Sequence, residues 1–173
     1  GTIGALSNNS TGVAGINWVS GILPVRVLGK CGGSTSDVAD GIRWAAGVTA
    51  GLPANPNPAR VLNISLGVLI PCSATPSLQS AINDVTAAGA VVVVAAGNEE
   101  VDASNSSPGS CNGVITVAAV KRNGGLAYYS NYGTTVEIAA PGGDQSVASA
   151  DGILSTLNTG ATSPVVSPGG DTY

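Results

Sequence analysis

Short apolar runs alternate along this chain with stretches in which apolar residues recur at helical spacing. Runs rich in valine, isoleucine and leucine predict strands at residues 23–28, 61–66, 91–96, 114–120 and 136–140, with a further candidate at 153–157. The run at 91–96 is apolar almost throughout, which is typical of a parallel strand covered on both faces. The pattern therefore predicts a sheet of short strands.

Two segments between these runs each carry one apolar face. In the first, the spacing predicts a helix, capped by Ser36 or a neighbour, whose apolar positions are Val38, Ile42, Ala45 and Ala46. In the second, Thr75 is the expected N-cap and Pro76 the first helical residue, and the buried stripe is Leu78, Ala81, Ile82 and Val85. Gly89 is expected to end this helix, because glycine readily adopts the left-handed conformation found after helices.

The order of these elements predicts the fold class. Strands that alternate with helices favour an α/β fold: an open, doubly wound, mostly parallel sheet with helices on both faces. In such sheets ligands bind beyond the carboxyl ends of the strands. The loops at 29–34, from 67 onward and from 97 onward are therefore where a site is expected.

Composition narrows the class of protein. A length of 173 residues fits one ordinary domain, and the balance of 43% hydrophobic to 9% charged residues argues against a disordered chain. The formal net charge of −4 gives no basic footprint for a phosphate backbone, so no nucleic-acid partner is expected. The apolar run at 90–96 is far shorter than the about 20 residues of a membrane helix, so no membrane association is expected either.

One predicted strand ends in a polar side chain at the functional edge of the sheet. In Ala95-Ala96-Gly97-Asn98 the asparagine could present its amide to a ligand, or it could simply form a tight turn, since asparagine tolerates unusual backbone angles. A nucleotide-binding α/β domain would need a glycine-rich phosphate loop, and neither G-x-G-x-x-G nor G-x-x-x-x-G-K-[ST] occurs.

Several segments, read in order, resemble the subtilases, the family of secreted serine proteases that includes subtilisin and proteinase K. They are Gly1 to Val13, Val25 to Leu28, Gly41 to Ala45, Asn63 to Gly67, Ala95 to Asn98, Tyr129 to Gly133 and Ala140 to Gly142. The resemblance runs from Gly1 to about Thr156 and is weak beyond it. It implies a subtilisin-like, incomplete fold, in which residues 1–173 are a single partial catalytic domain.

The resemblance also implies an activity and what this stretch contributes to it. The family hydrolyses peptide bonds with a Ser-His-Asp triad through an acyl-enzyme, yet this sequence contains no histidine. The family's histidine and serine motifs would lie just upstream of Gly1 and just downstream of Tyr173. The chain is therefore expected to be an inactive interior segment of a secreted, monomeric endopeptidase that acts on polypeptides. The alternative is a catalytically dead module that binds peptides.

The resemblance assigns substrate contacts by position. Asn98 matches the asparagine that donates to the oxyanion of the tetrahedral intermediate. The two walls of the primary specificity pocket match Ser65, Leu66 and Gly67 and Ala95, Ala96 and Gly97. Gly32, Gly33 and Ser34 match the edge segment that pairs with an extended substrate backbone, although a flexible loop before a helix is the competing interpretation.

Calcium is the cofactor that the resemblance implies. The loop from Leu6 to Val13 matches a calcium-binding loop, with the expected oxygen ligands Leu6, Asn9, Thr11 and Val13. It is one residue longer than in subtilisin, so Asn8 could replace Asn9, and a plain Asn/Ser-rich turn is the alternative. A second calcium site matches Asn112 and Val114, but Glu137 stands where the family has an aspartate.

The chain contains three cysteines, so at least one of them has no partner within it. Of the three cysteines, Cys72 and Cys111 lie in loops on either side of the Asn98 strand and could form a disulfide, which would suit a secreted enzyme. Reduced buried thiols are the alternative. Cys31 would then pair with a cysteine outside this segment.

Overall fold

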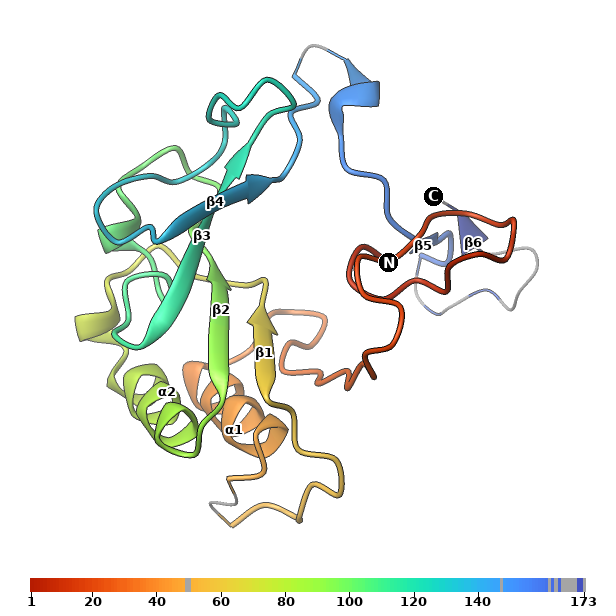
Figure 1. Ribbon diagram of the computed structural model, residues 1–173. Helices are drawn as coiled ribbons and strands as arrows, with labels where there is room; N and C mark the ends of the chain where they lie inside the picture. Colours follow the sequence, from red (N-terminus) through yellow and green to blue (C-terminus); the bar gives the residue numbers. More distant parts are fainter. Residues whose placement is uncertain (49–50, 147, 162, 164, 166–170, 173) are drawn as a thin grey trace. The chain divides into compact units, whose positions relative to one another are not determined.

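The computed structural model describes residues 1–48, 51–146, 148–161, 163, 165 and 171–172. The chain divides into two compact units (Figure 1). The central unit is Leu23–Gly152, and the terminal unit combines Gly1–Ile22 with Ile153–Tyr173. Each unit is described by itself.

The central unit is built on a parallel sheet. Its strands are β1 (Val61–Ile64), β2 (Val91–Ala95), β3 (Val114–Val120) and β4 (Ile138–Pro141), in the order β1-β2-β3-β4. Every neighbouring pair is parallel, and the register places Ile64 beside Val94 and Val94 beside Thr116. The predicted α/β class and parallel sheet are confirmed, with strand ends that differ from the predicted ones by a residue or two.

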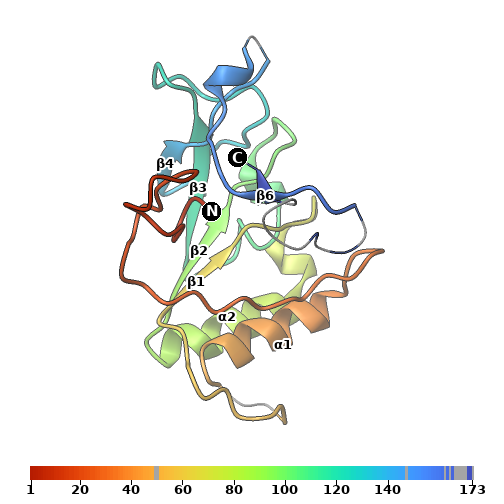
Figure 2. The ribbon, with the colours of Figure 1, turned by 90° about the vertical axis from the view of Figure 1, so that its right-hand side faces the viewer.

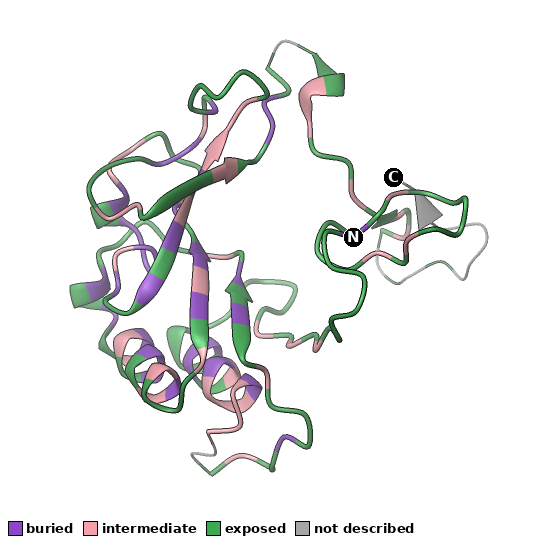
Figure 3. Ribbon diagram, viewed as in Figure 1, coloured by how far each residue is buried: buried purple, intermediate pink, exposed green. Residues whose placement is uncertain are grey.

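Two helices cover one face of this sheet. They are α1 (Thr35–Ala45) and α2 (Pro76–Ala87), which lie side by side (Figures 1 and 2). Their apolar stripes and the inward side chains of β1, β2 and β3 form one core (Figure 3): Val38, Ala39, Ile42, Ala45, Leu62, Ile64, Leu78, Ala81, Ile82, Val85, Val92, Val94 and Val114.

Helices were expected on both faces of the sheet, but in the described part of the chain the opposite face does not carry them. Among the described residues no α-helix lies on it, because the connections from β2 to β3 and from β3 to β4 consist of loops and the short 3₁₀ helix η2 (Ala103–Asn105). Val61, Val91, Ile115 and Ile138 point to this face and are exposed.

The ends of the helices follow from local chemistry. Ser34, a neighbour of the predicted Ser36, caps α1 in a reciprocal capping box with Asp37. Pro76 begins α2 as predicted, and Gly89 follows its end with a φ of +87°. Thr75 occupies the N-cap position without capping, because its hydroxyl instead contacts Ser107 Oγ at 2.9 Å.

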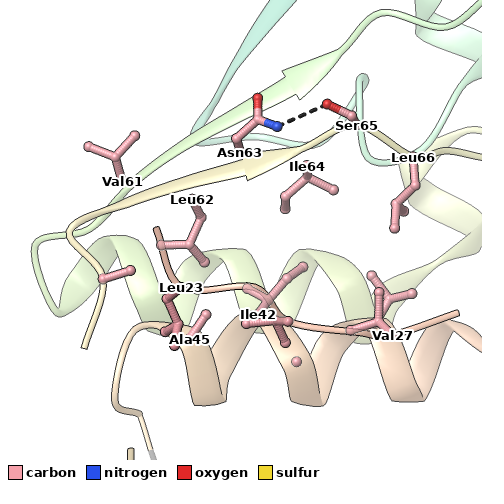
Figure 4. A pocket seen from close by; sticks show the side chains of 14 residues that line it. Leu23, Val27, Ile42, Ala45, Val61, Leu62, Asn63, Ile64, Ser65 and Leu66 are labelled. Atoms are coloured by element: carbon pink, nitrogen blue, oxygen red, sulfur yellow. Dashed lines mark hydrogen bonds between the residues drawn. The ribbon is translucent and has the colours of Figure 1, made fainter. Parts of the chain in front are cut away.

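The strand predicted at 23–28 does not form. Val25 and Val27 do pack against the core, but no strand among the described residues lies beside them to supply ladder hydrogen bonds. A cavity of about 290 Å³ separates this segment from β1 instead. Figure 4 shows its apolar lining, with Leu23 and Val27 on one side and Leu62 on the other.

The terminal unit is mostly loop. Its strands β5 (Leu157–Asn158) and β6 (Asp171–Thr172) pair antiparallel, so of the strand predicted at 153–157 only residue 157 is in a strand. The N-terminal loop is closed by backbone hydrogen bonds, among them Gly15 N to Ala5 O at 3.2 Å. In the described parts of both units, no helix has the length and apolar character needed to cross a membrane.

Candidate functional site

A small pocket lies beyond the carboxyl ends of β1 and β2, where the fold class predicts a site. Its volume is about 110 Å³. Because β1 and β2 are parallel and adjacent, the two predicted walls leave the sheet together and face the same space. The pocket is lined by Ser65, Leu66, Gly67, Val68, Ala95, Ala96, Gly97, Asn98, Glu99, Ser106 and Ser107.

The far side of the pocket comes from the β2–β3 connection, which sequence reasoning did not assign. Val68 and Ser107 exchange two backbone hydrogen bonds of 2.9 Å, which hold this connection against the segment after β1. A side chain at position 67 would come within 2.9 Å of the Ser107 carbonyl oxygen. Glycine at 67 therefore allows the close approach that shapes the pocket.

Asn98 stands at the rim of this pocket. Its side chain is exposed and makes no hydrogen bond to any residue that the structure describes, so both hydrogens of its amide can be donated to a ligand. Its backbone N–H, in contrast, donates to Glu99 Oε2 at 2.9 Å. The backbone of the loop is thus fixed while the Asn98 amide faces outward.

Asn131 is a buried residue beneath this loop to which sequence reasoning gave no role. Its residue exposure is 0%, and its side chain bonds to several groups of the loop at 96–101. It lies within Tyr129-Ser130-Asn131-Tyr132-Gly133, a motif that the resemblance singled out only as a pattern. A polar residue in a segment between two short strands gives no sign in sequence that it will be buried.

The structure does not bring Gly32, Gly33 and Ser34 to this pocket. Gly29 and Gly32 form a tight turn, and the Ser34 side chain is occupied by the capping box. A side chain at position 33 would overlap the Val27 carbonyl oxygen, so glycine is required there by packing. The predicted contact of these residues with a substrate stays a prediction.

The predicted calcium loop belongs to the terminal unit. Asn8 and Ser10 adopt left-handed backbone conformations with φ of 59° and 57°, which curl the loop. Asn9 Oδ1 accepts a long hydrogen bond of 3.2 Å from Thr11 N. The carbonyl oxygens of the other predicted ligands accept no hydrogen bond from described residues: Leu6, Thr11 and Val13. Neutral oxygen atoms with free lone pairs are the kind of ligand that calcium prefers.

Oxygen atoms at the second predicted calcium site take part in the protein's own hydrogen bonds. The Asn112 carbonyl oxygen accepts from Gln79 Nε2 at 3.0 Å, and the Glu137 carboxylate accepts from Thr116 N at 2.5 Å. Val114 begins β3 and takes part in its ladder with β2. In the described part of the chain, no three acidic, cysteine or histidine side chains gather as a metal site. The second calcium site at Asn112 and Val114 therefore stays a prediction.

The structure joins Cys72 and Cys111 in a disulfide, as predicted. Cys72 lies in the 3₁₀ helix η1 (Cys72–Ala74) before α2, and Cys111 lies in the β2–β3 connection. The bridge therefore ties the chain after β1 to the connection that forms the far side of the pocket. Cys31 is exposed and has no disulfide within the residues described.

The loop after β4 contains Asp144, a carboxylate with a large pKa shift. The Ser146 hydroxyl, followed by the Ser146 N–H, holds the pKa of Asp144 well below its usual range, and Lys121 Nζ at 3.1 Å adds to this. Burial, and then the charge of Asp144, raise the pKa of Tyr129, whose hydroxyl donates to the Gly143 carbonyl oxygen at 3.0 Å. These contacts fix the loop after β4 and supply no nucleophile.

Comparison with known proteins adds the family. Residues 1–169 match the Subtilase family. The "Extracellular protease" of Xanthomonas campestris pv. campestris is 52% identical over 165 residues, which are 95% of this chain and 27% of that protein. The "Extracellular basic protease" of Dichelobacter nodosus is 48% identical over 166 residues, 95% of this chain and 26% of that protein. The chain thus spans about a quarter of the length of these curated relatives.

The fold agrees with a solved relative. A structure of proteases from Pseudoalteromonas arctica superposes on 100% of this chain with a TM-score of 0.92 and 53% identity, and the match covers 50% of that chain. This structural match agrees with the family that the sequence motifs indicated. With a family match over residues 1–169, this chain belongs to the subtilase family.

Proposed function

We propose that the whole protein carrying this chain is a secreted, monomeric endopeptidase that hydrolyses peptide bonds in polypeptides through an acyl-enzyme. One observation carries the proposal: the Asn98 amide, which bonds to no described residue, stands at the rim of a pocket walled by small residues, at the carboxyl edge of the sheet. Two relatives that are named extracellular proteases support secretion. The family match extends over both units, which supports one catalytic domain.

In this proposal the chain binds the substrate and stabilises charge. A substrate side chain enters between Ser65–Gly67 and Ala95–Gly97, which places the carbonyl to be attacked near Asn98. The Asn98 Nδ2 then donates to the oxygen that becomes negative in the tetrahedral intermediate. Because the sequence has no histidine, the general base comes from outside these 173 residues, and the segment alone is inactive.

The turn before α1 gives a second substrate contact. The Gly33 N–H and carbonyl have no backbone partner among the described residues, whereas Gly32 pairs with Gly29. An extended substrate backbone can pair with such free groups by strand addition. In the predicted segment Gly32, Gly33 and Ser34, the free groups of Gly33 make this contact, while Gly32 stays paired with Gly29 and Ser34 keeps its capping role.

The loop from Leu6 to Val13 is proposed to hold a structural calcium ion. The ligands are the carbonyl oxygens of Leu6, Thr11 and Val13 and the Asn9 side chain, which keeps one lone pair beside its bond to Thr11 N. When bound, calcium supplies a rigid cross-link between loop residues and takes no part in the reaction.

The test of the proposed function is Asn98→Ala in the whole protein. Peptide hydrolysis is measured per active site, counted with a serine-directed covalent inhibitor. We expect kcat to fall with little change in KM, because the donor acts on the transition state. The expected size is the one established for the corresponding asparagine of subtilisin, about 10²–10³-fold in kcat.

A matched control is Asn123→Ala, another exposed loop asparagine whose side chain accepts from Gly125 N at 3.0 Å. The kcat of the Asn123→Ala variant should stay at the wild-type value. Undiminished activity of the Asn98 variant would overturn the oxyanion role. A whole protein that binds peptides but neither hydrolyses them nor reacts with the inhibitor would instead be the catalytically dead peptide-binding module.

A further inference from the structure

The Asn131 side chain is bonded almost entirely to the loop that carries Asn98. Its Oδ1 accepts from Glu99 N at 2.9 Å and from Val101 N at 3.1 Å. Its Nδ2 lies 3.0 Å from the Ala96 carbonyl oxygen and 2.8 Å from Glu99 Oε2, with Ser106 Oγ as a further acceptor at 3.0 Å. Both lone pairs and both hydrogens of the amide are therefore in use.

The backbone around Asn131 continues the same attachment. Asn131 N donates to the Gly97 carbonyl oxygen at 3.1 Å, and Glu100 N donates to the Tyr129 carbonyl oxygen at 3.1 Å. Gly97 has a φ of +113°, and a side chain there would overlap Asn131 Nδ2 and come within 2.6 Å of Glu99 Oε2. The loop at 96–101 is thus wrapped closely around one buried amide.

Glu99 links this buried amide to Asn98 itself. Its Oε2 accepts from Asn98 N at 2.9 Å and from Asn131 Nδ2 at 2.8 Å. Groups on both sides of Asn98 are therefore held by Asn131: Ala96 before it, and Glu99 and Val101 after it. The direction of the Asn98 side chain depends on this backbone, because the side chain makes no hydrogen bond of its own to described residues.

We propose that Asn131 is a positioning residue for the proposed peptidase reaction, acting through Asn98. It holds the loop at 96–101 in the one conformation that aims the Asn98 amide at the oxyanion, and Glu99 carries part of this effect. The inference rests on the proposed function of Asn98. It differs from a purely structural role because it predicts a lower rate per correctly folded active site.

The test is a double-mutant cycle in the whole protein with Asn131→Ala, Asn98→Ala and the pair. For Asn131→Ala we expect kcat per titrated active site to fall by about 10–100-fold, the size of loss that a small misplacement of a catalytic group produces. In the Asn98→Ala background the same substitution should lower kcat by less than about twofold, since the group it positions is already absent.

Glu99 gives a second pair of variants that does not depend on a buried substitution. Glu99 is exposed, so Glu99→Ala should fold, and losing its link should lower kcat by about two- to tenfold. Glu99→Gln keeps an acceptor oxygen and should restore most of that loss. The matched control is Asn55→Ala: Asn55 is another buried asparagine, whose Nδ2 donates to the Trp44 and Ala45 carbonyl oxygens at the end of α1. The Asn55→Ala variant should give fewer active sites but the same kcat per site.

The outcomes separate the two proposals. An unaffected Asn98→Ala variant overturns the oxyanion role and, with it, any positioning through Asn98. A normal kcat per site in Asn131→Ala, or losses that multiply in the double variant, overturns the positioning role alone. If Asn131→Ala yields no titratable protein, the Glu99 variants decide: equal kcat in Glu99→Ala and wild type overturns the inference.

Discussion

Opening the Cys72–Cys111 bridge should destabilise the protein by an amount that follows from the loop it closes. The two cysteines are 39 positions apart, and the loop between them contains α2 and β2. In the chain-entropy account, closing a loop of this length removes about 13 cal/mol/K from the denatured chain, which is about 4 kcal/mol at 25 °C. Cys72→Ala, Cys111→Ala and the double variant should each lose this amount, because either single change already opens the loop.

The assay is urea unfolding of the whole protein, with its active site blocked by the covalent inhibitor. Tryptophan fluorescence reports the fraction unfolded. The midpoints, multiplied by a common m value, give the change in the free energy of unfolding. Single losses that add in the double variant would show that the sulfurs contribute only through packing. A loss below about 1 kcal/mol would show that loop closure is not the source of stability at this position.

Two further outcomes concern pH and calcium. The depressed pKa of Asp144 means that its hydrogen bonds stabilise the folded state fully above the unfolded pKa of about 4 and that this stability is lost as pH falls through the folded pKa. Asp144→Asn should therefore lower the melting temperature near neutral pH and reduce its fall on acidification, and an unchanged acid profile would contradict this. Removing calcium with a chelator should lower the melting temperature of the wild type, and Asn9→Ala should shrink that decrease. At calcium 100-fold above the dissociation constant the effect is about 2.7 kcal/mol, and equal calcium dependence in both proteins would contradict a role for Asn9.

Much of the fold could be predicted because local chemistry and the final structure agree. Pro76 and Gly89 mark the ends of α2, and the apolar run at 91–96 became the central strand β2. The segment at 23–28 has the composition of a strand, yet it forms none. Strand composition gives a segment the tendency to pair, but a partner must lie beside it, and this is a property of the tertiary structure.

The site was predicted unevenly for a related reason. The walls at 65–67 and 95–97 meet because parallel neighbouring strands end at the same edge, which topology alone implies. Asn131 and Ser107 reach the loops around the pocket through long-range contacts, and nothing near them in sequence indicates it. The Ser34 side chain caps α1, a role for which the sequence indicated Ser36 or a neighbour.

The wrapping of residues 96–101 around Asn131 limits how this framework can be re-engineered. Asn131 is some 30 positions away in sequence from the loop it supports. Grafting this 96–101 loop into a relative with a different residue at position 131 would leave the Glu99 and Val101 N–H groups without their acceptor. Successful chimeras should therefore exchange both segments as one module, and libraries that vary the loop alone should yield few folded members.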